Sequence, residues 1–369
     1  MSNQSGGTQA PWAYHVGAGP RCALMRHRAV AVAGLFLATL WTLAGVASAE
    51  AATYCVAPGG SDSGPGTELE PWGTLTASLP KLAPGDTLLV RDGTYVERVV
   101  RVPIHEGTAS QPITVRAYTG ERPVLQGLLW LNRPSYWVID GLNVTWDDAT
   151  GNRREHMVKV TDGVGWTIRN AEIWGAKSFA AVLVATGTPG EPRNWRITGC
   201  AIHDTNPTHR INQDHLIYVN SGGHPNNGRI ERNLLYNAPN GEAVKLGPPT
   251  ALEPGPAGVR IRYNTIYHTS QAVLVADSAW GNVIERNIVV DVIGTNPAFR
   301  SYMLTGRFNV ARNNLVYSAA RVFMGDAGYG ELEDGGGNVT GLDPELEPPV
   351  PHGLRARSPA AWKYGRYGQ

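Results

Sequence analysis

Side chains that can take up or release protons are concentrated in one central stretch of the chain, between positions 203 and 245. Four of the ten histidines, His203, His209, His215 and His224, fall within 22 residues. Among the other polar residues of this stretch are Asp204, Arg210, Asp214, Tyr218, Glu242 and Lys245. Histidine, carboxylate, lysine and tyrosine side chains act as general acids and bases. The stretch therefore predicts a proton-transfer site, although a solvated loop with hydrogen-bonded surface histidines would have the same composition.

A metal site is indicated less strongly. His203, Asp204, His209 and His215 lack the tight, regular spacing of a zinc site. Asp214 or Glu242, together with loop carbonyl groups, offers the hard oxygen ligands that calcium prefers. Calcium is therefore a possible ion, but the sequence spacing of these residues assigns no metal ligands.

The elements that must position these side chains are short, repeated strands. The pattern apolar-x-x-Asn-x-apolar recurs along the chain, and in its earlier copies another residue replaces the asparagine. Its fourth residue stands at positions 142, 171, 200, 233, 264, 287 and 313. Runs of four to six residues, rich in β-branched side chains and bounded by Gly, Asn, Asp and Pro, favour strands over helices. Strands this short cannot bury a face alone and must stack on copies of themselves.

We therefore predict an all-β fold, a single right-handed parallel β-helix solenoid over residues 53–369. Asn233, Asn264, Asn287 and Asn313 should stack in one turn, where their amides can bond up and down the stack. Cys200 replaces a ladder asparagine, and Cys55 lies before the first rung. Two buried thiols are expected rather than a disulfide, because a bond would have to span several rungs at ~4.8 Å each.

Strand parity predicts which side chains face outward. The apolar residues that should point inward are Val158/Val160, Val182/Val184, Ile217/Val219, Val244/Leu246 and Val273/Val275. Alternation then sends one column outward, which is Lys159, Leu183, Tyr218, Lys245 and Leu274. Tyr218 and Lys245 become neighbours on adjacent rungs, with His215 and Glu242 at the bend two residues earlier. The loop from His203 to His209 should fold over this face.

The amino-terminal part of the chain predicts export. Residues 1–24 show no regular pattern, and we interpret them as an over-extended start without structure. Residues 25–49 begin with a basic stretch, continue with an apolar run and end in Ala47-Ser48-Ala49, as in a secretory signal peptide. A membrane anchor is the alternative, but the run is shorter than the ~20 residues that span a bilayer. We expect cleavage near Ala49 and a secreted, extracytoplasmic protein without a stable membrane anchor.

Composition narrows the class of partner. Hydrophobic residues make up 42% of the 369 residues, which is enough for a large core. The formal net charge is +1, so nucleic acid is not expected as a partner. We expect a monomer.

Both ends of the predicted solenoid resemble a known group. The segment from Thr53 carries Ala57-Pro58-Gly59-Gly60, the sequence from Pro71 to Leu75, and Arg91-Asp92-Gly93-Thr94-Tyr95. Gly341-Leu342-Asp343-Pro344 and the segment from Leu354 to Ala360 look like the closing part of the same proteins. Together they resemble secreted right-handed β-helix proteins of the pectate-lyase-like (pectin lyase fold) superfamily. The resemblance implies that residues 74–82 form a short capping helix over the first rung.

The resemblance also implies action on a polysaccharide. β-Elimination from a uronic-acid glycan needs a cation at the sugar carboxylate, a base for the neighbouring proton and an acid for the leaving oxygen. Lys245 is the candidate base, and Tyr218 or His215 the candidate acid. The candidate substrate-binding residues are His203, Asp204, His209, Arg210, Asp214, Arg260 and Arg262, of which Arg260 or Arg262 would clamp the carboxylate.

Glu242, Lys245 and the following arginines are similar to the arrangement in chondroitinase-and-alginate-lyase β-helix enzymes. Those enzymes carry a second acidic residue two positions after the first, where this chain has Val244. A glycoside hydrolase is one alternative, with Asp214 and Glu242 as two carboxylates ~5–10 Å apart. A non-catalytic carbohydrate-binding or surface module is the other. It would use tryptophans that recur along the first half of the chain, which are Trp130, Trp137, Trp146, Trp166, Trp174 and Trp195.

Overall fold

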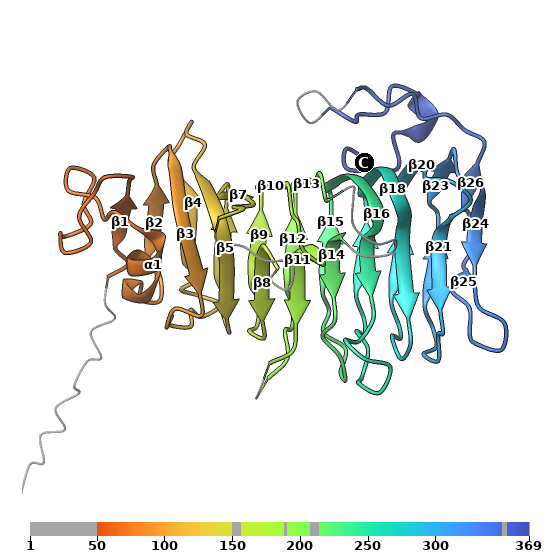
Figure 1. Ribbon diagram of the computed structural model, residues 1–369, viewed down its shortest axis with the longest axis horizontal. Helices are drawn as coiled ribbons and strands as arrows, with labels where there is room; N and C mark the ends of the chain where they lie inside the picture. The colour runs from red at the N-terminus through yellow and green to blue at the C-terminus, as the bar shows by residue number, and fades with distance from the viewer. Residues whose placement is uncertain (1–49, 150–155, 188–189, 207–213, 349–352, 369) are drawn as a thin grey trace, which may run out of the picture. The chain divides into compact units, whose positions relative to one another are not determined.

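The computed structural model describes residues 50–149, 156–187, 190–206, 214–348 and 353–368 (Figure 1). The expectations for residues 1–24 and 25–49 therefore lie outside the described residues. Within the described ranges, no helix is long and apolar enough to cross a membrane. The helices are short: α1 (Leu75–Ser78) and two 3₁₀ turns, η1 (Leu79–Lys81) and η2 (Pro359–Ala361). The rest of the regular structure is strand, so the all-β expectation is confirmed.

One sheet, which we call the first face, contains eleven strands, and neighbours pair in parallel. Its strands in spatial order are β1 (Thr53–Val56), β2 (Thr87–Val90), β4 (Ile113–Ala117), β6 (Trp137–Asp140), β9 (Thr167–Arg169), β12 (Arg196–Thr198), β15 (Arg229–Glu231), β17 (Arg260–Arg262), β19 (Val283–Glu285), β22 (Val310–Arg312) and β25 (Glu333–Asp334). Successive strands of this face are one repeat apart in sequence. This is the pairing of a parallel β-helix.

A second sheet of fifteen parallel strands supplies the other two faces. Its strands are β3 (Thr94–Val100), β5 (Val124–Asn132), β7 (Asn143–Thr145), β8 (Val158–Thr161), β10 (Glu172–Trp174), β11 (Ala180–Ala185), β13 (Ala201–His203), β14 (His215–Val219), β16 (Leu234–Leu246), β18 (Thr265–Ala276), β20 (Ile288–Val292), β21 (Pro297–Tyr302), β23 (Leu315–Tyr317), β24 (Arg321–Met324) and β26 (Val339–Thr340).

The long strands of this sheet turn a corner. In β16 the early residues pair with β13 and the late residues pair with β14. We call the part with β7, β10, β13, β20, β23 and β26 the second face, and the part with β8, β11, β14, β21 and β24 the third face. Figure 1 shows the strands stacked side by side.

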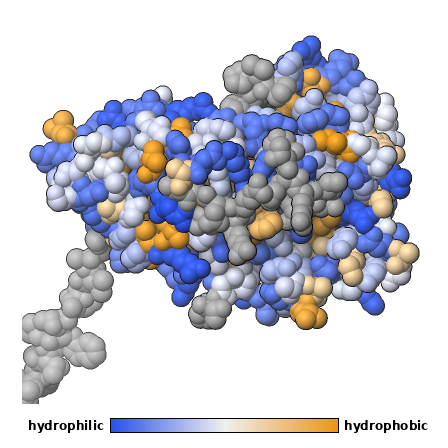
Figure 2. All heavy atoms as spheres, viewed as in Figure 1, coloured by the Kyte–Doolittle hydropathy of each residue, from blue (hydrophilic) through white to orange (hydrophobic). Residues whose placement is uncertain are grey.

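The core lies between the three faces and is filled one layer per rung. On the first face one apolar residue from each of six rungs stacks inside, and these are Ile139, Ile168, Ile197, Ile230, Ile261 and Ile284. Trp137, Trp166 and Trp195 are also buried, so three of the six repeated tryptophans are core residues. In Figure 2 the visible surface is mostly hydrophilic, and apolar side chains are scattered in small groups.

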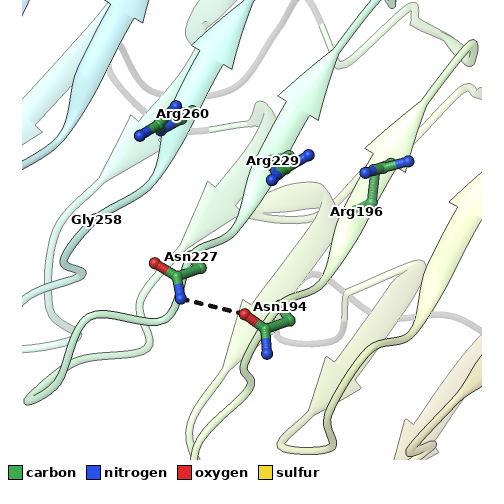
Figure 3. A pocket seen from close by; sticks show the side chains of 6 residues that line it. All are labelled: Asn194, Arg196, Asn227, Arg229, Gly258 and Arg260. Atoms are coloured by element: carbon green, nitrogen blue, oxygen red, sulfur yellow. Dashed lines mark hydrogen bonds between the residues drawn. The ribbon is translucent and has the colours of Figure 1, made fainter. Parts of the chain in front are cut away.

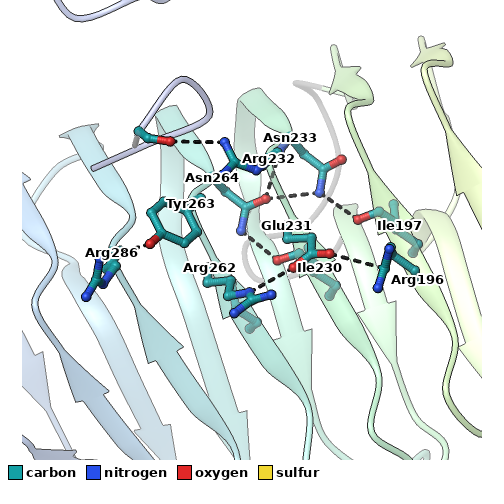
Figure 4. Close-up of polar contacts among 12 residues, drawn as sticks. Arg196, Ile197, Ile230, Glu231, Arg232, Asn233, Arg262, Tyr263, Asn264 and Arg286 are labelled. Atoms are coloured by element: carbon teal, nitrogen blue, oxygen red, sulfur yellow. Dashed lines mark hydrogen bonds and ion pairs between the residues drawn. The ribbon is translucent and has the colours of Figure 1, made fainter. Parts of the chain in front are cut away.

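Buried asparagines form a ladder at the turn between the first and second faces (Figure 4). The Nδ2 of Asn233 donates to Oδ1 of Asn264 at 3.0 Å, and Asn264 donates to Asn287 at 3.0 Å. Asn287 continues to Asn314, and Asn314 to Asn338. The ladder expectation is confirmed for Asn233, Asn264 and Asn287.

The expectation for Asn313 is wrong. Ile284 pairs with Ala311 rather than with Val310, so Ala311 is the residue of this rung that points into the core. The ladder position, three residues later, is therefore occupied by Asn314. Asn313 instead has φ 52° in the left-handed turn, the place that Arg232, Tyr263 and Arg286 occupy in earlier rungs. Asparagine tolerates that conformation better than most residues.

The two cysteines of the described chain are buried and free, as expected. Cys200 occupies the ladder position, where its backbone N–H donates to Oδ1 of Asn233 at 2.9 Å.

Both end segments pack against the stack. Thr74 caps α1 through its hydroxyl, and Leu75, Leu79 and Leu82 are buried in the core next to the first strands. At the other end, Tyr364 is buried in a small apolar cluster with Ile288 of the second face. The contacts of α1 and η1 confirm the expected short capping helix, which covers core residues at the first strands.

Candidate functional site

The strands of the third face position the predicted Tyr218–Lys245 pair. Tyr218 of β14 pairs with Lys245 of β16, and Lys245 pairs with Leu274 of β18. The flanking residues Ile217, Val219, Val244 and Leu246 are all fully buried. The outward column also contains Lys159 and Leu183, so the expected strand parity is confirmed. The column continues to Arg300 of β21.

Lys245 and Tyr218 touch each other directly. The Lys245 ammonium nitrogen lies 4.8 Å from the centre of the Tyr218 ring. The Tyr218 hydroxyl donates to the carbonyl of Pro248 at 3.0 Å. Burial lowers the pKa of Lys245, while Glu242 and Asp277 act in the opposite direction. Burial, aided by Asp277, raises the pKa of Tyr218 to about 12. The pair therefore combines a lysine that loses its proton more easily than usual with a tyrosine that keeps it.

His215 and Glu242 form a buried side-chain contact at the edge of the same face. The Nδ1 of His215 contacts Oε2 of Glu242, and both residues are almost completely excluded from solvent. Burial alone would raise the pKa of Glu242, but the charge and hydrogen bond of His215, with Lys245 farther away, lower it overall. The ring of His215 also packs edge-on against Tyr218, with ring centres 5.7 Å apart. His215 therefore packs against Tyr218, and Glu242 lies three residues before Lys245 on the same strand.

A pocket of about 280 Å³ opens beside Lys245. It is lined by Glu242, Lys245, Pro248, Pro249, Thr250, Ala251, Leu274, Ala276, Asp277 and Tyr302. Sequence reasoning missed Asp277 and Tyr302. The available signal was Asp277 at the carboxyl end of the apolar run Val273–Ala276, on the rung next to Lys245. Burial raises the pKa of Asp277, and the charge of Lys245 opposes that shift.

His203 and Asp204 lie on and just after β13 of the second face, not beside Lys245. His203 contacts Glu172 through Nε2 at 3.0 Å and Asp204 through Nδ1 at 2.8 Å. Its ring stacks on Tyr236, with ring centres 4.5 Å apart. Asp204 also accepts a hydrogen bond from Asn237. This network joins neighbouring rungs, and it does not bring His203 over the pair on the third face as expected.

The remaining predicted residues are dispersed. His209 and Arg210 lie outside the described residues. Asp214 precedes β14 directly, is fully buried and has φ 62°. Arg260 and Arg262 belong to β17 of the first face, so the expected carboxylate clamp beside Lys245 is not formed by them. The reason is their place in the rung. Both arginines come before the ladder residue Asn264 and so lie on the first face. Lys245 comes after the ladder residue of its own rung and after the second face, and so lies on the third face.

Figure 4 shows where Arg262 points. Its Nε contacts Oε2 of Glu231 at 2.8 Å, and Glu231 also pairs with Arg196. Arg260 lies instead in a row with Arg196 and Arg229 (Figure 3). Among the residues that the structure describes, no group of three or more His, Cys, Asp or Glu side chains could hold a metal ion.

Known proteins resemble this chain over much of its length. Residues 54–238, just over half of the chain, match the family model "Pel9A-like, right handed beta helix region". Pectate lyase PEL9 of Emericella nidulans is 24% identical over 267 residues, which are 67% of this chain and 62% of that protein. The uncharacterized protein YwoF of Bacillus subtilis (strain 168) is 42% identical over 73 residues, 20% of this chain and 15% of YwoF. The matches thus span less than two thirds of either relative.

A solved structure supports the same fold. The structure named "Rhamnogalacturonan lyase" superimposes with a TM-score of 0.54 at 14% identity, covering 86% of this chain and all of that one. Identity at this level shows the fold alone. The parallel stack, the asparagine ladder and the family match agree with one another. The chain therefore belongs to the Pel9A-like β-helix family of the pectate-lyase-like superfamily.

Proposed function

We propose that the protein is a polysaccharide lyase that cleaves a uronic-acid-containing glycan by β-elimination on the third face. The observation that carries the proposal is the outward pair of Lys245 and Tyr218 beside a pocket of about 280 Å³. Membership of the family and the similarity to a pectate lyase support this class of reaction. We also infer that the coil is right-handed, as the description of the family model has it, and that the chain is exported after removal of residues 25–49.

In the proposed reaction the neutral amine of Lys245 removes the proton on the carbon next to the sugar carboxylate. The electron pair of that C–H bond forms the C=C bond, and the bond to the glycosidic oxygen breaks. The Tyr218 hydroxyl leaves its hydrogen bond to the Pro248 carbonyl, donates instead to the glycosidic oxygen, and transfers its proton to it. Lys245 then returns a proton to the tyrosinate, so no water is consumed. Adjacent rungs are rigid enough to hold an acid and a base within reach of one sugar.

The electrostatics of the site suit these two roles. A general base works best when its pKa is near the working pH, and burial moves Lys245 in that direction. The buried pair of Glu242 and His215 positions the strand end that carries Lys245. The lining of the pocket beside Lys245 contains no second cationic side chain, so the group that neutralises the sugar carboxylate is not assigned to a residue of this lining.

The experiment that tests the class of reaction is a screen of acidic polysaccharides for rising ultraviolet absorbance. Elimination produces an unsaturated sugar that absorbs, whereas hydrolysis does not. We expect absorbance to rise on at least one polyuronate. New reducing ends without a rise in absorbance would show that the protein is a hydrolase rather than a lyase. Neither new reducing ends nor a rise in absorbance on any glycan would favour a binding module.

A glycoside hydrolase is the second candidate, and one observation favours it. Glu242 and Asp277 line the same pocket, and their pKa values shift in opposite directions, down for Glu242 and up for Asp277. Two carboxylates with divergent pKa values are the arrangement that a hydrolase needs. A binding module is less well supported, because Trp137, Trp166 and Trp195 are buried and cannot stack on a sugar.

Replacing Tyr218 by phenylalanine should lower turnover by about a hundredfold, a typical contribution of a general acid. The ring and its contact with Lys245 remain, so the melting temperature should change little. Activity that survives in Tyr218→Phe would assign the acid role to another group.

The dependence of turnover on pH should report Lys245. Because the base must lose its proton, kcat should rise with pH and level off above the pKa of Lys245, which burial places below the ordinary lysine value. Tyr218, with a pKa raised to about 12, should stay protonated through that rise. A kcat that falls as pH increases through this range would contradict the assignment of Lys245 as base.

A further inference from the structure

Three arginines stand in a row on the outer side of the first face. Arg196 of β12 pairs in register with Arg229 of β15, and Arg229 with Arg260 of β17. The guanidinium groups therefore repeat at the rung spacing of ~4.8 Å. Figure 3 shows the three side chains aligned across neighbouring strands. Together with Asn194, Asn227 and Gly258 they line one hollow with a volume of about 490 Å³. This hollow lies on a different face from the pocket beside Lys245.

The row carries positive charge that its surroundings do not balance. Two positions farther along each strand, the neighbouring column alternates in sign: Arg262 binds Glu231 at 2.8 Å, and Arg312 binds Glu285 at 2.9 Å. In the row itself Arg196 shares Glu231 with Arg262. Within the described ranges of the chain, neither Arg229 nor Arg260 has an ion pair. Like charges on directly opposite strand positions repel each other, so the row costs stability unless an anion occupies it.

The turn before the row makes room for a ligand. Asn194, Asn227 and Gly258 precede the three strands, and all three have positive φ. Asn227 donates from Nδ2 to Oδ1 of Asn194 at 3.2 Å, and both asparagines are exposed. Gly258 has no side chain at the third position, which widens the hollow beside Arg260. The lining is therefore three guanidinium groups, two amides and one glycine, and it contains no acidic residue.

We propose that this row, Arg196, Arg229 and Arg260, is a second binding site for an acidic polysaccharide, distinct from the site on the third face. Guanidinium groups bind carboxylates in a bidentate way, and a regular row matches a polymer that carries one carboxylate per sugar. The exposed amides of Asn194 and Asn227 can bond to sugar hydroxyls. The site binds the glycan and performs no reaction. It does not depend on elimination at Lys245, so either proposal can fail alone.

The test uses a short oligogalacturonate as probe and the full chain with Lys245→Ala, so that any cleavage of the probe is slow. Arginines are modified with phenylglyoxal with and without the probe, and the modified positions are mapped by mass spectrometry. We expect Arg229 and Arg260 to be protected, and Arg169 and Arg312 on the same face to react equally in both samples. Equal reactivity of Arg229 and Arg260 at saturating probe would overturn the proposal.

Variants give an independent measurement. Arg229→Gln combined with Arg260→Gln should weaken the calorimetric affinity of the first-face site by about tenfold, as expected for two partly exposed ion pairs. The matched control, Arg169→Gln with Arg312→Gln, removes the same charge from the same face and should leave this affinity unchanged. The row variant should not melt earlier than the parent, because it relieves repulsion. Equal losses in both variants, or equal protection by single-stranded DNA, would overturn the assignment of an acidic-polysaccharide site.

Discussion

Replacing Lys245 by alanine is expected to lower kcat on a polyuronate by about a hundredfold or more, which is the range of a general base. The loss follows from the proposed reaction, because the outward neighbours of the pair in this column, Leu183 beside Tyr218 and Leu274 beside Lys245, cannot accept a proton. The melting temperature should change little, since the ammonium packs on the face of the Tyr218 ring and the inward neighbours Val244 and Leu246 are untouched. Initial rates and thermal unfolding of the same preparation measure both quantities.

Lys159 provides a matched control on the same face. It stands in the same outward column, its ammonium lies 5.1 Å from the centre of the Trp130 ring, and burial lowers its pKa as well. Lys159→Ala therefore removes a similar side chain from a similar environment outside the pocket. We expect full activity in Lys159→Ala. An equal loss in both variants would mean that general damage to the third face, rather than removal of a base, lowers the rate.

The largest expected effect on stability comes from the ladder. Asn264→Asp replaces an amide that donates to the carbonyl of Ile230 at 2.9 Å and to Oδ1 of Asn287 at 3.0 Å. A carboxylate there would face two acceptors in a fully buried place. We expect the free energy of unfolding to fall by about 3 kcal/mol at neutral pH. Burial raises the pKa of the introduced carboxyl group, so the penalty should shrink below pH 4 or so, where the group is protonated in both states.

Asn313→Asp is the control for this change. Asn313 is exposed and lies in the left-handed turn beside the ladder, a conformation that aspartate also accepts. The same chemical change should therefore alter the free energy of unfolding by less than about 0.5 kcal/mol. Chemical denaturation of both variants at two pH values measures the difference. Equal destabilisation by the two substitutions would contradict the position of the ladder.

Parity explains how much of the third face could be predicted from sequence. Ile217/Val219 and Val244/Leu246 leave one register in which both strands bury their apolar residues, and that register sets Tyr218 beside Lys245. His215 and Glu242 follow because they stand at equal offsets before the inward residues. Such local rules hold without knowledge of the loops.

The rest of the site depends on geometry that no local pattern contains. Arg260 and Arg262 were expected beside Lys245 because they follow it on the next rung. Each rung contributes a strand to all three faces, however, and these arginines lie on the first face. Asp277 was missed because it enters the pocket from the end of β18, where the last residues, Val273–Ala276, are all apolar. Asn313 was expected in the ladder in place of Asn314 because Val310 is more apolar than Ala311. The residue that points into the core is nevertheless the smaller Ala311, because strand register and side-chain size decide which residue faces inward.

The mass of the cleavage products formed in ¹⁸O-labelled water is the most direct test of elimination on the third face. Elimination adds no water, so each cut of a polyuronate should give one unsaturated end, products lighter by one water than hydrolysis products, and no incorporated label. The same products should be formed about a hundredfold more slowly by Lys245→Ala. Saturated products that carry one ¹⁸O per cut, formed at equal rates by both proteins, would contradict the account.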